Sequence, residues 1–292
     1  IVVGDQVSTL GYTTAGDGGG GLYEAVAAGT GTVDGGSFIN SNPSGSFQLK
    51  LITTKVSALN WGVLKDGTVA QQVKMQAAQD YAEANTGGDV FYPAGTYSYA
   101  APITIADFGS VSGVGYKSRL TPLGCDGFTF AASGALAGRA PFKDIWVDGD
   151  ATAGTICFDV KVDATAATRV SGLLFDNVYV DGFEIAWDLG GTWHTTIRHC
   201  HAYAVWQAVH LIDRNIQTII DGCTLKNSWI NLAPAGATKG VNMPDLGSAN
   251  DNQITIDNNY INRTVLGTTS SHLGIYAGVN QKNVSIINNN IV

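Results

Sequence analysis

The chain has 292 residues, of which 45% are hydrophobic, 14% are charged and 37 are glycine, a composition typical of a secreted or extracellular β protein with many turns and a large core. Sixteen basic residues against 24 acidic ones give a formal charge of −8, which argues against a nucleic-acid binder, since such a protein neutralises phosphates with basic side chains. No apolar run reaches the roughly 18 residues of a transmembrane helix, so the sequence predicts no membrane insertion.

The first 56 residues predict a small N-terminal β unit. Residues 2–7, 11–17 and 20–26 are predicted to form short β strands around Gly-rich turns. Gly16–Gly21 formally satisfies a GxGxxG nucleotide motif, but it leads into a strand rather than a helix, so a hairpin turn explains it better. We therefore divide the chain into residues 1–56 and a main domain over residues 57–292.

One helix is predicted after residue 68. Thr68 and Gln71 have the spacing of a capping box. An apolar residue then recurs every fourth position over about four turns, at Val69, Val73, Ala77 and Tyr81. Gly87 and Gly88 end the helix, and a short strand at 90–92, a turn at 93–96 and a further strand from Tyr97 follow.

Residues 61–97 resemble the opening segment of the pectate-lyase-like superfamily of right-handed parallel β-helices. That pattern reads aromatic-Gly, Asp-Gly, a helix with Gln-x-Ala, and then Gly-Gly-x-Val-x-x-Pro-x-Gly-x-Tyr; here it stands as Trp61-Gly62, Asp66-Gly67, Gln76-Ala77-Ala78 and 87–97. Ala70-Gln71-Gln72 departs from the family's usual helix start. The resemblance implies an all-β fold, a right-handed single-stranded parallel β-helix with an N-terminal capping α-helix and a small N-terminal β unit.

Internal repeats also indicate a solenoid, in which each coil needs a neighbour to bury its apolar face. Residues 142–149 match residues 175–182, and shorter copies begin at Ile197, Ile220, Ile256 and Ile286. Alternation of apolar and polar residues within each copy predicts strands. Asparagine tolerates a left-handed bend and its amide can stack from coil to coil, as expected at Asn177, Asn258 and Asn288.

A second strand is predicted after each bend, at 157–160, 184–187, 208–211, 229–232 and 274–277. The side chains expected to point inward are Phe158, Ile185, Val209, Ile230 and Ile275. The outward positions form a polar stripe, which we interpret as a carbohydrate groove: Asp159, Lys161, Glu184, Asp188, His210, Asn231 and Tyr276.

Three carboxylates of this stripe are the candidate catalytic residues. Adjacent coils lie about 4.8 Å apart and alternate residues along a strand about 6.6 Å apart, which places Asp159 roughly 8 Å from both Glu184 and Asp188. Such a separation suits an inverting glycosidase, whose two carboxyl groups lie roughly 6.5–9.5 Å apart. The competing acids, several of them beside glycine as turn residues are, are Asp148, Asp150, Asp181, Asp213 and Asp221.

The candidate substrate-binding residues are the other polar members of the stripe and two tryptophans. Sugar rings offer C–H faces to aromatic side chains, and Trp187 is expected inside, which leaves Trp193 and Trp206 beside Lys161, His210, Asn231 and Tyr276. No cofactor is predicted. No metal site is predicted either, because no acidic cluster is dense enough for calcium and the pair His199 and His201 lacks a third ligand.

A polysaccharide lyase is the rival mechanism, ranked below hydrolysis. In a lyase, a base removes the proton next to a uronate carboxyl group while a cation neutralises the carboxylate. The side chains suited to these roles are His210, Lys161, Arg198 and Arg214.

The N-terminal unit resembles the small β segment that precedes the β-helix in phage tail spikes. Its motif is Gly4-Asp5-x-Val7, then Gly11-Tyr12, then residues 16–20. The resemblance implies a homotrimeric spike of the virion tail, extracellular in location, that binds and depolymerises a bacterial capsular polysaccharide or O-antigen. The N-terminal side would then attach to a phage tail or baseplate protein.

Two other functions stay open at this point: a non-catalytic receptor-binding spike that holds a glycan without cleaving it, and a bacterial pectin-type lyase or hydrolase unrelated to phage. The chain ends at residues 288–292 in the middle of a coil, so we expect the β-helix to continue in a longer polypeptide.

The four cysteines, Cys125, Cys157, Cys200 and Cys223, are predicted to be buried free thiols. A disulfide between Cys200 and Cys223 is the alternative.

Overall fold

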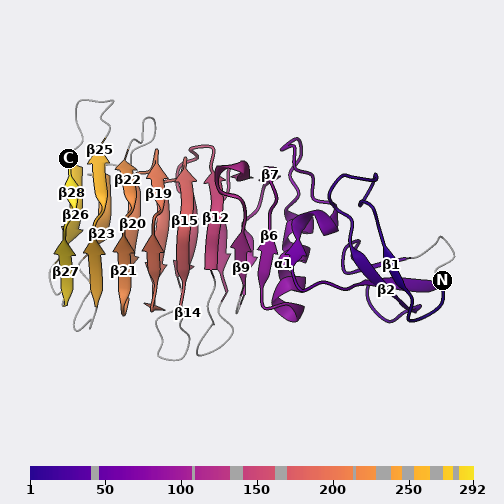
Figure 1. Cartoon of the computed structure of the whole chain (residues 1–292). Helices are drawn as coiled ribbons and strands as arrows, with labels where there is room; N and C mark the ends of the chain where they lie inside the picture. Colours follow the sequence, from indigo (N-terminus) through magenta and orange to yellow (C-terminus); the bar gives the residue numbers. More distant parts are fainter. Residues whose placement is uncertain are drawn as a thin grey trace.

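The computed structural model describes residues 1–40, 46–106, 109–131, 141–161, 170–212, 215–227, 238–244, 253–263, 272–278 and 283–292. The chain forms an elongated solenoid with its two termini at opposite ends (Figure 1). Coils of parallel strands follow one another along the long axis, and a small antiparallel sheet lies at the N-terminal end.

The antiparallel sheet has four strands in the order β1-β2-β4-β3. They are β1 (Gln6–Ser8), β2 (Leu22–Ala27), β3 (Phe38–Asn40) and β4 (Phe47–Leu51). The Asp17 carboxylate accepts hydrogen bonds from the backbone N–H groups of Tyr12, Thr13, Thr14 and Gly19, and these bonds hold its pKa well below the usual range. The Gly-rich run is therefore a turn built around Asp17, as predicted from its sequence context.

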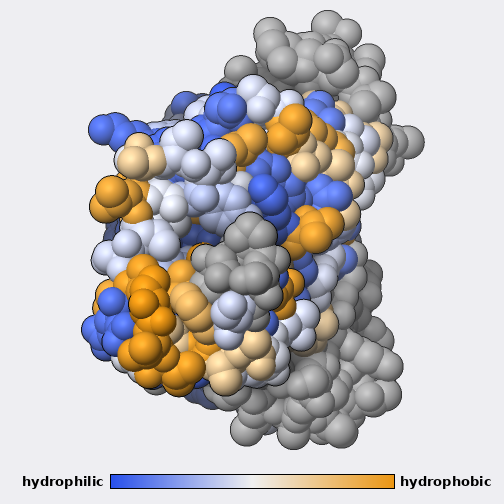
Figure 2. All heavy atoms as spheres, turned by 90° about the vertical axis from the view of Figure 1, so that its right-hand side faces the viewer, coloured by the Kyte–Doolittle hydropathy of each residue, from blue (hydrophilic) through white to orange (hydrophobic). Residues whose placement is uncertain are grey.

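This sheet packs on the first part of the solenoid. The Asn60 side chain donates to the Gly20 carbonyl at 3.0 Å, and the Tyr81 hydroxyl donates to the Leu51 carbonyl at 3.4 Å. Seen from the N-terminal end, hydrophobic residues lie in small patches between hydrophilic ones (Figure 2). The exposed apolar side chains of this unit include Ile1, Val2, Val3 and Leu10.

The strand β5 (Val56–Ser57) leads into the 3-10 helix η1 (Ala58–Trp61) and then the helix α1 (Gln72–Asn85). The predicted capping box is absent, because the Thr68 hydroxyl donates to Asp66 and the Gln71 side chain bonds the backbone of Leu64 instead. The helix consequently starts later than predicted, and only half of the predicted stripe, Ala77 and Tyr81, packs against the core. Val69 and Val73 are exposed, and the buried positions are Met75, Ala78, Gln79 and Ala82.

In the part of the chain that the structure describes, the solenoid consists of a fifteen-stranded sheet, a seven-stranded sheet and a two-stranded pair. Every pairing within these sheets is parallel, and crossovers between parallel strands are almost always right-handed. The predicted right-handed parallel β-helix is confirmed. The strands and the second 3-10 helix are β6 (Asp89–Phe91), β7 (Gly95–Tyr99), β8 (Ile103–Ile105), β9 (Ser110–Ser112), η2 (Gly115–Lys117), β10 (Ser118–Pro122), β11 (Phe128–Phe130), β12 (Pro141–Asp148), β13 (Ile156–Lys161), β14 (Val170–Ser171), β15 (Leu174–Asp181), β16 (Ile185–Gly190), β17 (Thr192–Trp193), β18 (Thr196–Arg198), β19 (His201–Tyr203), β20 (Gln207–Ile212), β21 (Thr218–Asp221), β22 (Thr224–Asn227), β23 (Thr238–Met243), β24 (Ile254–Asp257), β25 (Tyr260–Arg263), β26 (His272–Ala277), β27 (Val284–Ile287) and β28 (Asn290–Ile291).

The predicted repeats stack in register. Phe142 pairs with Phe175, and the line continues through Ile197, Ile220, Ile256 and Ile286. The predicted bends are left-handed, with φ of 55° at Asn177, 54° at Asn258 and 52° at Asn288. Amides reach the previous coil here, since Asn177 donates to Asp144 at 2.6 Å and Asn288 to Asp257 at 3.1 Å.

A second asparagine ladder lies inside the solenoid, one residue after the bend. Asn259 is buried; its Oδ1 accepts the Cys223 N–H at 2.9 Å and its Nδ2 donates to the Ile220 carbonyl at 3.0 Å. Asn289 repeats this arrangement one coil later, accepting the Asn259 N–H at 3.0 Å.

Free thiols are confirmed for all four cysteines, of which Cys125 is only half-buried.

Aromatic rings fill the core on the side of the seven-stranded sheet. Phe128 and Phe158 stack with centroids 5.4 Å apart, and Phe158 and Trp187 stack at 6.0 Å. Ile185 and Trp187 both point inward as predicted, but the register is shifted by two residues, so Phe158 pairs with Trp187 and Ile185 pairs with Ile156. No helix in the described ranges is long and apolar enough to cross a membrane.

Candidate functional site

A line of polar side chains follows the outer face of the seven-stranded sheet. Core residues alternate with them along each strand, and side chains of successive strand residues point to opposite faces, so the polar members point outward. Direct register across seven strands joins Thr104, Thr129, Asp159, Asp188, His210, Asn242 and Tyr276. We call these seven residues the outer row.

The two acids of the outer row are direct neighbours. Asp159 on β13 pairs with Asp188 on β16 without offset, whereas the expected separation of roughly 8 Å assumed an offset of two residues. Their backbones are therefore about 4.8 Å apart, the spacing of adjacent strands. Asp188 is only 2% exposed, while Asp159 is half-buried and closer to solvent.

Glu184, the third predicted acid, lies outside the outer row. It precedes β16 and stands four residues before Asp188, which places it roughly 14 Å from Asp159 along the sheet rather than the expected 8 Å. Its Oε2 accepts the Gly154 N–H at 2.7 Å, so this carboxylate fixes the loop before β13. The register therefore does not bring the pair Asp159 and Glu184 together.

His210 is the next member of the outer row after Asp188. Its Nδ1 lies 3.0 Å from Oδ1 of Asp188, and its side chain is 18% exposed against 2% for the aspartate. The same strand pairing that stacks the coils sets this contact, since Asp188 and His210 are partners in the β16–β20 ladder. A protonated His210 would form an ion pair with Asp188 at this distance.

Three polar residues beside His210 were not predicted. Asn242 on β23 follows His210 in register, the place that the sequence assigned to Asn231. Its Nδ2 donates to Gln207 at 2.7 Å, and its Oδ1 accepts from the Lys239 ammonium group at 3.0 Å. Burial lowers the pKa of Lys239, whose Nζ lies 4.4 Å from the ring centroid of Tyr276.

Of the remaining predicted binding residues, Trp206 lies closest in sequence to this group. The backbone N–H of Trp206 donates to the Glu184 carbonyl at 3.0 Å, and its backbone carbonyl accepts the Lys239 backbone N–H at 3.1 Å. Trp206 thus links neighbouring coils just before β20 and β23. Trp193 sits beyond the end of β16, in the β14–β17 pair. Asn231 and the side chain of Lys161 lie outside the described residues.

The competing acids and the arginines lie elsewhere. Asp150 accepts the Thr152 N–H at 3.2 Å, as a turn residue does. Arg198 forms an ion pair with Asp176 at 2.7 Å on the fifteen-stranded sheet. The outer row lies on the other sheet, the seven-stranded one. Asp148, Asp181 and Asp221 also belong to that sheet, while Asp213 and Arg214 lie outside the described residues.

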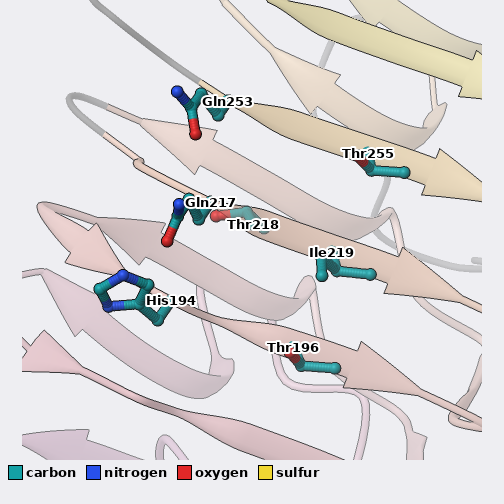
Figure 3. A pocket seen from close by; sticks show the side chains of 7 residues that line it. All are labelled: His194, Thr196, Gln217, Thr218, Ile219, Gln253 and Thr255. Atoms are coloured by element: carbon teal, nitrogen blue, oxygen red, sulfur yellow. The ribbon is translucent and has the colours of Figure 1, made fainter.

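A cavity of about 300 Å³ lies on the outer face of β18, β21 and β24. Figure 3 shows His194, Gln217 and Gln253 on one side and Thr196, Ile219 and Thr255 on the other, with Thr218 between them. The described residues that line it include one histidine, His194, and no carboxylate, so they offer no pair of acids. The outer row is therefore the better candidate for a reaction site.

No family model matches the chain. Among curated proteins, the tail spike protein of Shigella phage Sf6 is 27% identical over 176 residues, which cover 58% of this chain and 28% of that protein. The chain thus spans little more than a quarter of this relative.

Two solved structures illustrate the fold. A tailspike of Escherichia coli bacteriophage HK620, in complex with a pentasaccharide, matches with a TM-score of 0.57 and 11% identity, covering 88% of this chain and 50% of that one. A tailspike of Acinetobacter baumannii bacteriophage Fri1, described as a capsular polysaccharide depolymerase, matches with a TM-score of 0.50 and 15% identity, covering 99% and 68%. The chain is therefore similar to phage tail spikes in sequence and in fold, and its solenoid is a right-handed parallel β-helix.

Proposed function

We propose that this chain is part of a phage tail spike that binds a bacterial surface polysaccharide, either capsule or O-antigen, and hydrolyses its glycosidic bonds. The observation that carries the proposal is the side-by-side placement of Asp159 and Asp188 in the outer row, with His210 against Asp188. The described tail spike relatives, one a depolymerase and one holding an oligosaccharide, support the substrate class.

The geometry suggests a separate catalytic role for each of the two carboxyl groups. Asp159, the more exposed of the two, reaches the glycosidic oxygen and protonates it as the bond to the anomeric carbon breaks. The Asp188 carboxylate, positioned by His210, bonds to the anomeric carbon as the bond to the leaving oxygen breaks, and water that gives up a proton to Asp159 then displaces Asp188. Matched positions on adjacent coils are about 4.8 Å apart, which is near the roughly 5–5.5 Å between the carboxyl groups of retaining glycosidases and below the range of inverting ones. We therefore expect cleavage with retention of the anomeric configuration, rather than the inversion that an offset register would suggest.

The neighbouring polar residues supply substrate contacts in this account. Asn242, Gln207 and Lys239 form one hydrogen-bonded group beside His210, and Tyr276 extends the outer row. Amide and ammonium groups bind sugar hydroxyl groups, and an aromatic ring packs on a sugar face. Lys161, Asn231, Trp193 and Trp206 stay proposed substrate contacts from their sequence positions.

Lyase chemistry is the second candidate, and one observation favours it. Lys239, whose pKa burial lowers, lies against the Tyr276 ring of the outer row and is the side chain placed to remove a proton next to a uronate carboxyl group. Hydrolysis ranks first because the outer row places two acids on directly paired positions, whereas the Lys239 ammonium group donates a hydrogen bond to Asn242.

The assembly follows from the same proposal. We place the protein in the extracellular part of the virion tail, as a homotrimer attached to the tail or baseplate through the N-terminal sheet. Side-by-side packing of three solenoids would create grooves between subunits as well as within them.

Product analysis tests the function. The purified protein is incubated with capsular polysaccharides and O-antigens from a bacterial panel, and products are read by reducing-end assay and mass spectrometry. Saturated oligosaccharides with new reducing ends support hydrolysis. Products lighter by one water molecule would establish a lyase, and a glycan that is bound but never cleaved would establish a receptor-binding spike.

A further inference from the structure

A second outer face of the solenoid carries an unusual set of side chains, on β10, β12, β15 and β19 of the fifteen-stranded sheet. Arg119, Trp146, Tyr179 and His201 share one register line. Asp148, Asp181 and Tyr203 share the line two residues further along each strand. The residues between the two lines, such as Val147, Val180 and Ala202, are buried, so both lines point outward.

Aromatic rings dominate this face. Tyr116, from η2, lies over the sheet with its ring 3.7 Å from Tyr179 and edge-on to Trp146 at 5.7 Å. Tyr179 stacks on His201 at 4.6 Å, and His201 on Tyr203 at 6.2 Å. Tyr116 is 53% exposed, so this ring offers a large open surface to solvent.

A carboxyl pair lies beside the rings. Asp148 and Asp181 are direct partners on adjacent strands, and Asp148 forms an ion pair with Arg119, whose guanidinium also lies 4.6 Å from the Trp146 ring. Burial, and then the charge of Asp148, raise the pKa of Asp181 to about 6. At the other end of the rings, the Lys226 ammonium group lies 5.3 Å from the Tyr203 ring.

We propose that this aromatic strip, formed by Tyr116, Trp146, Tyr179, Tyr203, Asp148 and Asp181, binds a segment of the polysaccharide outside the outer row. The inference rests on the proposed function, since it assigns a second contact surface for the same class of glycan. The strip lies on a different sheet from the outer row, so one chain segment of the polysaccharide would occupy each surface.

The chemistry of the strip matches a glycan better than it matches other ligands. An exposed Tyr ring accepts the C–H face of a sugar, and carboxyl and guanidinium groups bind vicinal hydroxyl groups through paired hydrogen bonds. Acidic and basic groups occur together, which suits an uncharged, hydroxyl-rich chain rather than a polyanion. Together with Arg119 at one end and Lys226 at the other, the strip belongs to a surface that crosses four strand spacings, roughly 19 Å, which is long enough for several sugar units.

The test is a binding titration with Tyr116→Ala, with Val114→Ala as the matched control. Val114 is an exposed apolar residue just before η2, so its replacement removes surface from the same loop without removing a ring. Affinity for the polysaccharide that the wild-type protein recognises is measured by calorimetry on the purified protein in the Asp188→Asn background, which prevents cleavage. We expect Tyr116→Ala to weaken binding about three- to tenfold, the range of one lost aromatic contact, and Val114→Ala to match its parent.

Hydroxyl-radical footprinting gives an independent readout. Bound polysaccharide should protect Tyr116 and Trp146 from oxidation, while Tyr12, an exposed ring of the N-terminal unit, should stay as reactive as in the free protein. Equal affinities of the Tyr116→Ala and Val114→Ala proteins, or no protection of Tyr116 and Trp146 by a glycan that the wild-type protein cleaves, would overturn the strip and leave the proposed function standing. A wild-type protein that neither binds nor cleaves any glycan of the panel would overturn both.

Discussion

Asp159 and Asp188 occupy the same position on adjacent coils, directly opposite each other in the parallel ladder of β13 and β16. The stacking of coils, and not a loop conformation, fixes this relationship. Each acid is flanked along its strand by buried residues, Phe158 and Val160 for the first and Trp187 and Leu189 for the second, which anchor the register. A reaction site on this face would therefore be rigid before substrate arrives.

Replacing Asp159 with asparagine should abolish proton donation to the leaving oxygen. We expect the cleavage rate to fall about 10²- to 10⁴-fold, the usual contribution of a general acid. Reducing-end kinetics on the recognised polysaccharide measure it. The matched control is Asp80→Asn, which changes an exposed helical carboxylate of α1 and should cleave at the parent rate; an equal loss in both proteins would mean that Asp159 has no special role.

His210 should act by positioning the Asp188 carboxylate, which its Nδ1 approaches at 3.0 Å. His210→Phe should lower kcat about ten- to a hundredfold while KM changes less than about threefold, because the lost contact matters most as charge develops. His210→Gln retains an N–H donor and should recover part of the loss. A rise in KM with unchanged kcat would instead make His210 a substrate contact.

The core stack should dominate stability. Phe158→Ala removes a buried ring that contacts Phe128, Phe175 and Trp187, and such a cavity costs about 3–5 kcal/mol in free energy of unfolding. Thr104→Ala, at an exposed position of the outer row on β8, should cost less than about 0.5 kcal/mol. Urea denaturation measures both. Similar midpoints for the two variants would argue against the described register of the core.

The pH dependence of stability should differ between two aspartates of the fifteen-stranded sheet. The pKa of Asp181 is raised to about 6, so between pH 4 and 6 the folded state holds a proton that the unfolded state has released, and this contribution to stability is lost as pH rises through that window. Because Asp181 is partly exposed, we expect only about 1 kcal/mol. The free energy of unfolding of Asp181→Asn should therefore gain about this much relative to wild type from pH 4 to pH 7.

Asp176 provides the opposite sign. Hydrogen bonding to Arg198, the largest cause, lowers its pKa, so its contribution is present above pH 4 and lost as pH falls below that value. Asp176→Asn should thus lose stability relative to wild type as pH rises from 2 to 5. Urea titrations at each pH check both variants, and parallel pH curves for wild type and Asp181→Asn would refute the assignment.

The sequence predicted the coil architecture well because the repeats report it directly. Phe142 and Phe175 pair as their matching octapeptides indicated, and Asn177, Asn258 and Asn288 adopt the predicted left-handed bends. Periodicity sufficed because each coil repeats the same buried and bent positions.

The sequence predicted the candidate site less well, because register across loops cannot be read from spacing. Asp159 meets Asp188 without offset, and Phe158 pairs with Trp187 rather than with Ile185, although Ile185 and Trp187 both point inward as predicted. Asn242 holds the place given to Asn231, since the strand at 238–243 pairs with both β20 and β26. The helix starts later than the sequence predicted because the side-chain amide of Gln71 hydrogen-bonds the backbone of Leu64. Local helix propensity does not include such a contact.

The most direct test of the central claim is the cleavage rate of Asp188→Asn, measured together with its affinity on a polysaccharide that the wild-type protein depolymerises. The account predicts a loss of at least about 10³-fold in kcat with a Kd within about threefold of wild type, because the substitution keeps the shape of the side chain and removes its charge. Cleavage at the wild-type rate by Asp188→Asn would contradict the assignment of the outer row as the catalytic site.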